Sequence, residues 1–195
     1  MRGAGARVVA IEPQRLFARF LRRTLPRDIE LVEAAVGAES GDTDMAVSRR
    51  HPTVSSLRAD FVEQATQISG FQHVRWDRTE RVRVVTLDQL ATEYGLPDYV
   101  KIDVEGFESE VLAGVTTPPP IVSVEFLPGF AAHTHAAMER LQTLGYYRFN
   151  PVVRESAQFL WSEWRDAKKT RTWLDTLPVD SESGDLFARL TDGRG

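Results

Sequence analysis

Short apolar runs that end at carboxylates constrain the fold of this chain more than any other feature of its sequence. The runs are Val8–Ile11 ahead of Glu12, Tyr99–Ile102 ahead of Asp103 and Glu105, and Ile121–Phe126, which carries Glu125. Continuous β-branched runs are typical of strands that are covered on both faces. Helical patterns lie between the runs, so the sequence predicts an α/β fold with a mainly parallel sheet.

The predicted elements form one domain over residues 1–195. A first strand, helix and second strand are expected at Val8–Ile11, Gln14–Leu25 and Ile29–Gly37, with a turn at Gly41-Asp42. The alternation in Arg81–Leu87 predicts a half-exposed edge strand, and Gly184–Leu190 is expected to be the last strand. Residues 50–80 are expected to be a lid or insert, and residues 154–195 a C-terminal helix and strand. Further helices are predicted over Gln89–Tyr94 with Asp88 as N-cap, Phe107–Leu112, Ala136–Leu144, and Glu163–Leu174 with Ser162 as N-cap.

Composition excludes several classes of protein. The 195 residues carry a formal net charge of −4, which argues against a polycationic nucleic-acid binder. Cysteine is absent, so disulfides, thiolate nucleophiles and Cys zinc sites are excluded. No apolar run approaches the roughly 18 residues of a membrane span. Residues 1–27 hold seven Arg and one acid, as in a transit peptide, but the strand pattern of Val8–Ile11 favours a folded element. We expect a soluble cytoplasmic protein with no nucleic-acid or membrane partner.

The carboxylates at the strand ends are the candidate site residues. Open parallel sheets bind ligands beyond the carboxyl ends of their strands. There Glu12 is placed to accept hydrogen bonds from both hydroxyls of a ribose, and the alternative is a solvated strand end. Asp103 and Glu105 are candidates for a general base or for holding a cofactor or cation, and the alternative is capping of the following helix. His133 and His135 lack a third metal ligand and are expected in a solvated loop, with His133 a minor candidate base.

Several of these segments together resemble the FkbM family of S-adenosylmethionine-dependent methyltransferases. The matching pieces are Val-Val-Ala-Ile-Glu-Pro (8–13), Ala-Val-Gly (35–37), Ser-Ser-Leu (55–57), Val-Thr-Leu-Asp (85–88), Lys-Ile-Asp-Val-Glu-Gly-Phe-Glu (101–108), Val-Leu-Ala-Gly (111–114) and Ser-Val-Glu-Phe (123–126). The similarity runs from about residue 7 to 126, with a weaker echo at Gly184–Leu190.

The resemblance implies a Rossmann-like class I methyltransferase fold and methyl transfer from S-adenosylmethionine to a hydroxyl of a sugar or small natural product. It implies that Glu12 binds the cofactor ribose, that the backbone at Ala35 and Val36 borders the adenine, and that Asp103 lies at the methyl-donor edge. Asp103 or Glu105 then takes the proton of the acceptor. A nicotinamide-dependent oxidoreductase and a non-catalytic fragment or interaction module are the alternatives, and a homo-oligomer is left open.

The chain departs from the family pattern ahead of Glu12. The family opens with a strand that ends in an Asp-x-Gly-type loop, and that strand normally lies in the middle of the sheet. No such strand and Gly-rich loop precede Glu12, so we expect an N-terminally truncated domain. Two strand edges would then lose their partners, at a cost of about 1–3 kcal/mol for each unpaired buried group. We therefore expect the chain to be unstable, rearranged or completed by another chain.

Overall fold

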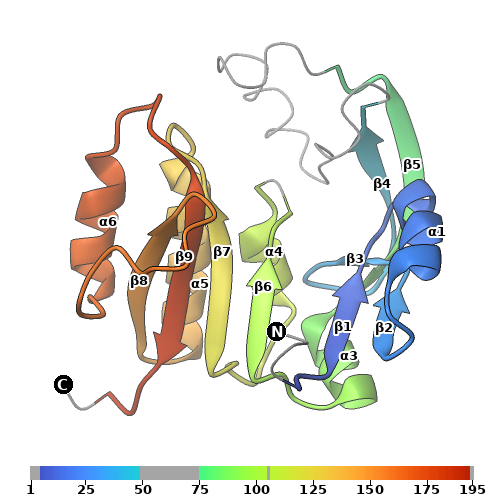
Figure 1. Ribbon diagram of the computed structural model, residues 1–195, viewed down its shortest axis with the longest axis horizontal. Coiled ribbons are helices and arrows are strands. Elements are labelled where there is room, and N and C mark those ends of the chain that lie inside the picture. Colours follow the sequence, from blue (N-terminus) through green and yellow to red (C-terminus); the bar gives the residue numbers. More distant parts are fainter. Residues whose placement is uncertain (1–4, 49–74, 105, 194–195) are drawn as a thin grey trace.

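A computed structural model describes residues 5–48, 75–104 and 106–193 of the chain (Figure 1). The described strands form three sheets. The first pairs β1 (Val8–Ile11) with β2 (Ile29–Val32), and the second has the order β3 (Ala35–Val36), β5 (Arg78–Val85), β4 (Gly41–Val47). The third has the order β6 (Tyr99–Ile102), β7 (Ile121–Phe126), β9 (Gly184–Leu190), β8 (Tyr147–Val153).

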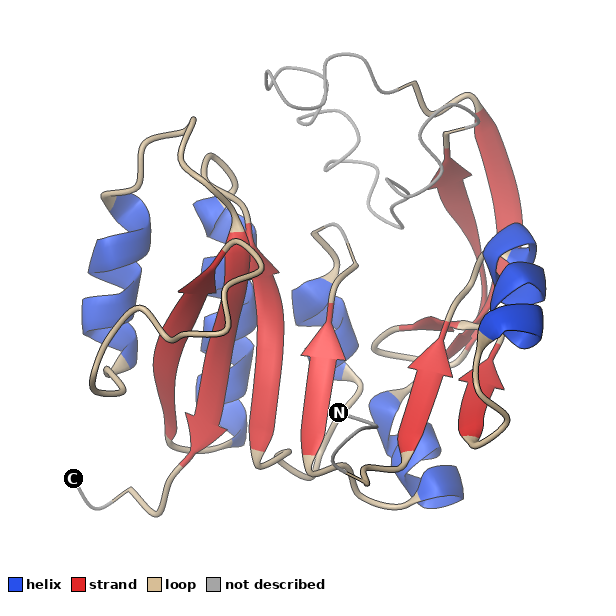
Figure 2. Ribbon diagram, viewed as in Figure 1, coloured by secondary structure: helices blue, strands red, loops and turns tan. Residues whose placement is uncertain are grey.

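The described helices connect these strands. They are α1 (Arg15–Thr24), α3 (Leu87–Tyr94), α4 (Glu108–Ala113), α5 (Ala131–Leu144) and α6 (Ala167–Asp175). Of these, α4, α5 and α6 lie against the third sheet (Figure 2). In Figure 2, α4 and α5 lie on one face of the sheet that contains β6 and β7. The apolar core is built there, because the inward side chains of β7, β8 and β9 pack against α4 and α5. Its fully buried members include Leu112, Val122, Val124, Phe126, Met138, Leu141, Phe149 and Leu186.

The sheets are mixed, so the prediction of a mainly parallel sheet was wrong. β1 with β2, β3 with β5 and β6 with β7 are parallel pairs. β4 with β5, β7 with β9 and β8 with β9 are antiparallel. The last strand causes much of this, because β9 returns between β7 and β8 instead of joining the edge of the sheet. Apolar patterning reports which faces of a strand are covered, and it carries no information on direction.

Two predicted strands have different limits or neighbours. The expected strand Ile29–Gly37 is divided into β2 and β3, which belong to different sheets. β5 is the middle strand between β3 and β4, so its assignment as an edge strand was wrong. Its alternating exposure arises because one face of the sheet is open to solvent, while both edges are paired. The turn expected at Gly41-Asp42 is instead the start of β4.

Helix starts also differ from the predictions. The N-cap of α3 is Thr86, whose hydroxyl and backbone form a reciprocal capping box with Gln89, so Asp88 is not the cap. The N-cap of α6 is Asp166, which accepts a hydrogen bond from Lys169 N–H, and Ser162 lies outside the helix. α5 begins at Ala131, five residues before the predicted start. The starts of α3 and α6 each offered two residues of suitable cap chemistry, and the tertiary path of the chain selects between them.

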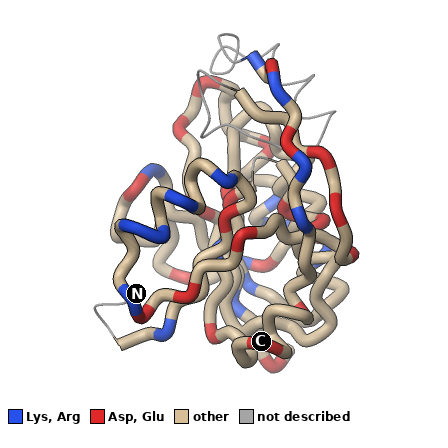
Figure 3. Tube along the Cα trace, turned by 90° about the vertical axis from the view of Figure 1, so that its right-hand side faces the viewer, with Lys and Arg blue, Asp and Glu red and all other residues tan. Residues whose placement is uncertain are grey.

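Most of the segment interpreted as a lid, residues 50–74, lies outside the described residues, and its last residues enter β5. The arginines near the N-terminus are concentrated on α1, which carries Lys/Arg colouring along much of its length in Figure 3. Among the described residues, the helices are too short and too polar for any of them to cross a bilayer.

Candidate active site

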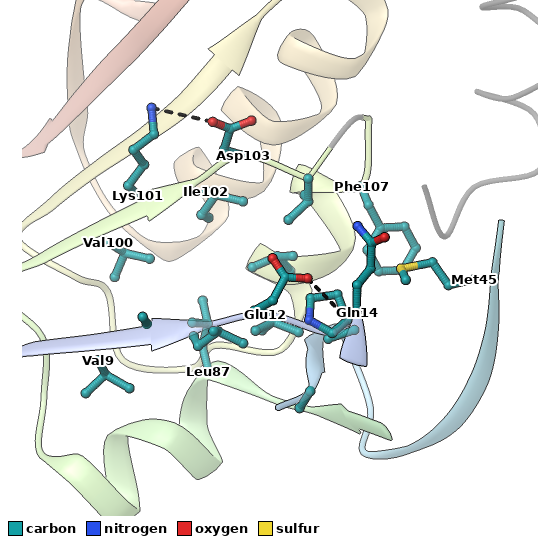
Figure 4. Close-up of a pocket in the computed structure, with 18 residues that line it drawn as sticks. Val9, Glu12, Gln14, Met45, Leu87, Val100, Lys101, Ile102, Asp103 and Phe107 are labelled. Atoms are coloured by element: carbon teal, nitrogen blue, oxygen red, sulfur yellow. Dashed lines mark hydrogen bonds and ion pairs between the residues drawn. The ribbon is translucent and has the colours of Figure 1, made fainter. Parts of the chain in front are cut away.

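A cavity of about 440 Å³ lies at the carboxyl ends of β1 and β6. The two strands point the same way in Figure 1, so their ends meet at one rim. Glu12, Ala35, Val36 and Asp103 all line this cavity (Figure 4). The structure thus brings together the four residues that the sequence had singled out for cofactor binding, from positions up to 91 residues apart in the chain.

Glu12 lies where β1 ends and the chain turns into α1. Its Oε1 accepts a hydrogen bond of 2.8 Å from the backbone N–H of Gln14, which fixes the direction of the carboxylate. Burial raises the pKa of the Glu12 carboxyl, and the Gln14 hydrogen bond acts in the opposite sense. A carboxylate has about four acceptor positions, so one backbone N–H leaves capacity for further donors such as paired hydroxyls.

The wall next to Glu12 is apolar. Ala35 and Val36 of β3 form part of it, and Leu87 of α3, Met45 of β4 and Phe107 complete it (Figure 4). All of these side chains are buried or half-buried. A flat heteroaromatic ring fits such a lining, because apolar walls bind the faces of a ring and a few polar groups fix its orientation. The sequence had not indicated Met45 or Phe107 as residues that line the cavity. Of the two, only Phe107 could have been found from the sequence, because it directly follows the Asp-Val-Glu-Gly motif.

Asp103 occupies the opposite, more polar side of the cavity. Its side chain is 51% exposed, and Oδ2 lies 3.7 Å from Nζ of Lys101. The same ammonium donates to both carboxylate oxygens of Asp185 at 2.9 Å. Burial of Lys101 would lower its pKa, but the hydrogen bond and charge of Asp185, with the charge of Asp103, leave the pKa of Lys101 raised. Lys101 therefore stays positively charged and holds Asp103 at the rim.

A second hollow of about 480 Å³ adjoins the cavity on this side. Lys101 and Asp103 line both spaces, so they form the wall between them. The second hollow is otherwise bordered by charged and polar groups from β7, β9 and the loops near them, Glu125, Arg154, Glu155, Glu182, Ser183 and Asp185 among them. One space is thus largely apolar with a carboxylate at its side, and the other is polar.

The turn after Asp103 is held by a buried carboxylate that sequence reasoning had passed over. Gly106 adopts φ +88°, which a residue with a side chain rarely adopts, and its N–H donates to Oε1 of Glu108 at 3.1 Å. Glu108 is 4% exposed, and burial raises the pKa of its carboxyl against the effect of the backbone hydrogen bonds it receives. The sequence indicated Glu108 only as an acidic residue in the first turn of a short helix. Glu105, predicted as a catalytic candidate, lies outside the described residues.

The two histidines are placed differently from the prediction. His133 and His135 belong to α5 and not to a loop, and neither lines the cavity. Nε2 of His135 lies 3.1 Å from a carboxylate oxygen of Asp175, and the ring of His133 stacks on Phe130. Because the helix begins earlier than expected, His133 packs on the N-cap residue of its own helix, and His135 faces Asp175 of α6. No group of three potential metal ligands occurs among the residues that the structure describes.

Two motif glycines hold the cavity wall in position. A Cβ on Gly114 would lie 2.2 Å from the carbonyl oxygen of Gly37, so the end of α4 touches the residue that follows β3. The carbonyl of Gly114 accepts from Asp88 N–H, and the Asp88 carboxylate accepts from the N–H and hydroxyl of Thr116. The Leu-Asp and Ala-Gly motifs thus join α3, α4 and β3 behind Ala35 and Val36.

Comparison with known protein families agrees with this geometry. A family model described as the methyltransferase FkbM domain matches residues 1–149. The chain belongs to the FkbM methyltransferase domain family. The matched range extends beyond the motifs recognised between residues 7 and 126, as far as β8, and does not include β9. Neither curated proteins nor solved structures gave a significant match. The strand-end cavity with Glu12 and Asp103 is therefore the candidate active site of an FkbM-type methyltransferase domain.

Proposed function

We propose that this FkbM domain is an S-adenosylmethionine-dependent O-methyltransferase that acts on a hydroxyl of a sugar or small natural product. The observation that carries the proposal is the cavity that joins Glu12 to Asp103 in a chain of this family. Membership of a methyltransferase family favours methyl transfer over the hydride transfer of a nicotinamide-dependent enzyme.

The lining of the cavity fits the parts of this cofactor. Glu12 offers carboxylate oxygens to the two ribose hydroxyls, and Gln14 N–H holds it in place. Ala35, Val36 and Leu87 offer an apolar surface to the adenine. Asp103 places a negative charge at the far side, where a sulfonium would be attracted to it, more strongly where water is excluded. When bound, the cofactor supplies an electrophilic methyl group.

The polar hollow beyond Asp103 is the proposed acceptor site. A hydroxyl bound there would lie next to the Asp103 carboxylate, which would take the proton of the hydroxyl. Lys101 keeps Asp103 in position from the other side, through its contact of 3.7 Å. Glu105 is the second candidate for the base. Holding the acceptor oxygen about 3 Å from the carbon it attacks supplies much of the rate.

We also propose the Rossmann-like class I arrangement for this domain. The sheet of β2 and β1 and the sheet of β6, β7, β9 and β8 would be two parts of one larger sheet, with the active site above the junction. Three observations support this: β1 and β6 point the same way, each ends at an acid, and their residues line one cavity.

Calorimetric titration with S-adenosylhomocysteine tests the cofactor assignment. We expect saturable binding with one site, weakened at least about tenfold in Glu12→Gln, which corresponds to about 1.4 kcal/mol. Glu30→Gln is the matched control, because Glu30 is an exposed acid on the neighbouring strand outside the cavity. Binding of NAD in place of S-adenosylhomocysteine would support the oxidoreductase, and binding of neither ligand would support the non-catalytic module.

Mass spectrometry of a panel of sugars and hydroxylated natural products tests the reaction. Each compound is incubated with S-adenosylmethionine and protein, and we expect a methyl ether product that is lost in Asp103→Asn. The Asp103→Asn protein should still bind S-adenosylhomocysteine. Unchanged turnover in that variant would remove Asp103 from the mechanism and leave Glu105 as the base.

A further inference from the structure

A further hollow, of about 730 Å³, lies on the third sheet at the end opposite the candidate active site. It is lined by residues of β8 and β9, by the segment ahead of α6 and by the chain beyond β9. Arg189 of β9 pairs in register with Ile121, the first residue of β7, so it is level with the amino ends of β6 and β7 (Figure 1). Asp103 follows the carboxyl end of β6. Among the described residues, none lines both this hollow and either of the spaces beside Asp103.

Two arginines stand directly opposite each other in this hollow. Arg148 of β8 and Arg189 of β9 are partners in the antiparallel register, so their side chains leave the same face of the sheet with Cβ atoms about 5 Å apart. No ion pair within the described part of the chain includes either guanidinium. Like charges directly opposite each other destabilise a sheet. An anion bound between the two guanidinium groups would remove this repulsion.

An aromatic ring holds one of the two guanidinium groups in place. Cζ of Arg189 lies 4.7 Å from the centre of the Trp164 ring, and the centroid of that ring lies 5.1 Å from that of Phe159. A guanidinium stacked on a ring keeps the N–H donors at its edge free, and their fork matches the two oxygens of a carboxylate. Arg148 is half-buried, which restricts its side chain as well. The pair is therefore largely organised before an anion binds.

The rest of the lining fits a sugar better than a bare anion. Tyr146 lines the hollow and is 73% exposed, and the face of an aromatic ring packs against the C–H groups of a sugar ring. The carboxylates of Glu163 and Asp166 and the hydroxyl of Ser162 border the same space and can accept hydrogen bonds from sugar hydroxyls. These two acids disfavour a nucleic acid, in which every unit carries a phosphate charge.

We propose that this hollow binds an acidic saccharide in which carboxylate-bearing sugars alternate with neutral ones. One carboxylate would lie between Arg148 and Arg189, and a sugar ring would pack on Tyr146. Hydroxyls of the neighbouring neutral sugar would donate to Glu163 and Asp166. The inference goes beyond the proposed function and does not rest on methyl transfer, because the hollow lies at the other end of the sheet from the reacting groups.

Calorimetric titration with a tetrasaccharide that alternates glucuronate with N-acetylglucosamine tests the class of ligand. Its methyl ester is the matched control ligand, because the ester keeps every hydroxyl and lacks the charge. We expect the acid form to bind at least about tenfold more tightly than the ester. Equal binding of the two forms would overturn the proposal. Tighter binding of inorganic sulfate, or of a single-stranded oligonucleotide, than of the tetrasaccharide would also overturn it.

Substitutions in the hollow test where the tetrasaccharide binds. Arg148→Gln and Arg189→Gln should each weaken binding of the acid form about tenfold and leave binding of the ester nearly unchanged. Tyr146→Ala should weaken binding of both forms by the same factor, because it removes the surface for the sugar ring. Arg23→Gln is the matched control, since it removes an exposed arginine of α1, and it should change binding less than about twofold. Unchanged binding in both hollow arginine variants would refute the site.

Two measurements do not depend on the affinity of a variant. The urea midpoint of Arg148→Gln should not fall in the free protein, because the substitution removes a contact between like charges. A fall would show that Arg148 stabilises the sheet and is not kept for a ligand. In hydroxyl-radical footprinting of the unmodified protein, the tetrasaccharide should protect Tyr146 from oxidation, and unchanged oxidation of Tyr146 would overturn the proposal even if an arginine variant does not fold.

The site can be told apart from the proposed acceptor site. Asp103→Asn should bind the tetrasaccharide as tightly as the unmodified protein does. Loss of binding in that variant would place the saccharide beside Asp103 and overturn the inference. Failure of S-adenosylhomocysteine to bind, with tetrasaccharide binding intact, would refute the proposed function and leave the saccharide site standing.

Discussion

Substitution of Gly114 by Ala should destabilise the domain strongly, because it forces a backbone contact apart. The added Cβ would lie 2.2 Å from the Gly37 carbonyl oxygen, whereas real Cβ contacts are at least 3.0 Å. The obstacle is main chain and no side-chain rotation relieves it, so α4 must move away from β3. Overpacking of a rigid contact costs typically 1–3 kcal/mol, and we expect about 3 kcal/mol here.

Urea unfolding of a graded series of variants measures this cost. Gly37→Ala meets a side-chain methyl group of Val84 at 3.0 Å, a looser contact than that of Gly114 with main chain, and we expect a loss of about 1 kcal/mol. Gly41→Ala has open space around its Cβ and should change the free energy of unfolding by less than about 0.5 kcal/mol. A Gly114→Ala protein as stable as Gly41→Ala would refute the close approach, and with it the reason why Ala35 and Val36 are held against the cavity.

Three further predictions follow from single contacts. Burial raises the pKa of Glu12 above its ordinary value of 4.5, so the folded state binds more protons than the unfolded state above that pH, and stability falls as pH rises through this window. Glu12→Gln should therefore be more stable than the unmodified protein at pH 7 but not at pH 4. Thermal unfolding of both proteins across that range measures the difference, and a constant difference would contradict the reasoning. Asp88→Ala loses both hydrogen bonds to Thr116 and should cost about 1 kcal/mol in urea unfolding, with no effect if the loop finds other partners. Burial raises the pKa of Tyr147 to about 12, and its hydroxyl donates to Pro119 O at 2.6 Å. Ultraviolet titration should therefore show a late tyrosine ionisation that is absent from Tyr147→Phe. We expect that variant to lose about 1–2 kcal/mol of unfolding free energy, because the buried carbonyl of Pro119 is left unpaired.

The candidate site was predictable to the extent that it consists of strand ends. Glu12 and Asp103 each follow a short apolar run, and parallel strands carry such residues to one rim whatever the details of packing. Met45 could not be found this way, because it lies on β4, a strand begun by a Gly-Asp pair that is typical of turns. Glu108 was missed because its burial depends on how the turn at Gly106 folds back over it.

The starts of the helices were likewise predicted in part by the sequence and decided in part by the tertiary structure. Asp88 has the chemistry of an N-cap, but Thr86 with Gln89 forms a capping box two residues earlier, and the Asp88 carboxylate is then directed to Thr116. The competing caps are equally good locally. The contact between α3 and the end of α4 selects one of them, and that contact joins segments about 28 residues apart.

The sequence by itself determined that strands alternate with helices over most of the chain and that acids follow the ends of β1 and β6, because both follow from local periodicity and from residues next to one another in the chain. The tertiary structure decided which strands are neighbours: β5 lies in the middle of its sheet, and β9 lies between β7 and β8. Pairing joins backbone groups of distant segments, and backbone groups are the same in every residue. Strand neighbours and open edges are therefore fixed by how whole elements pack around the core, which no local pattern records.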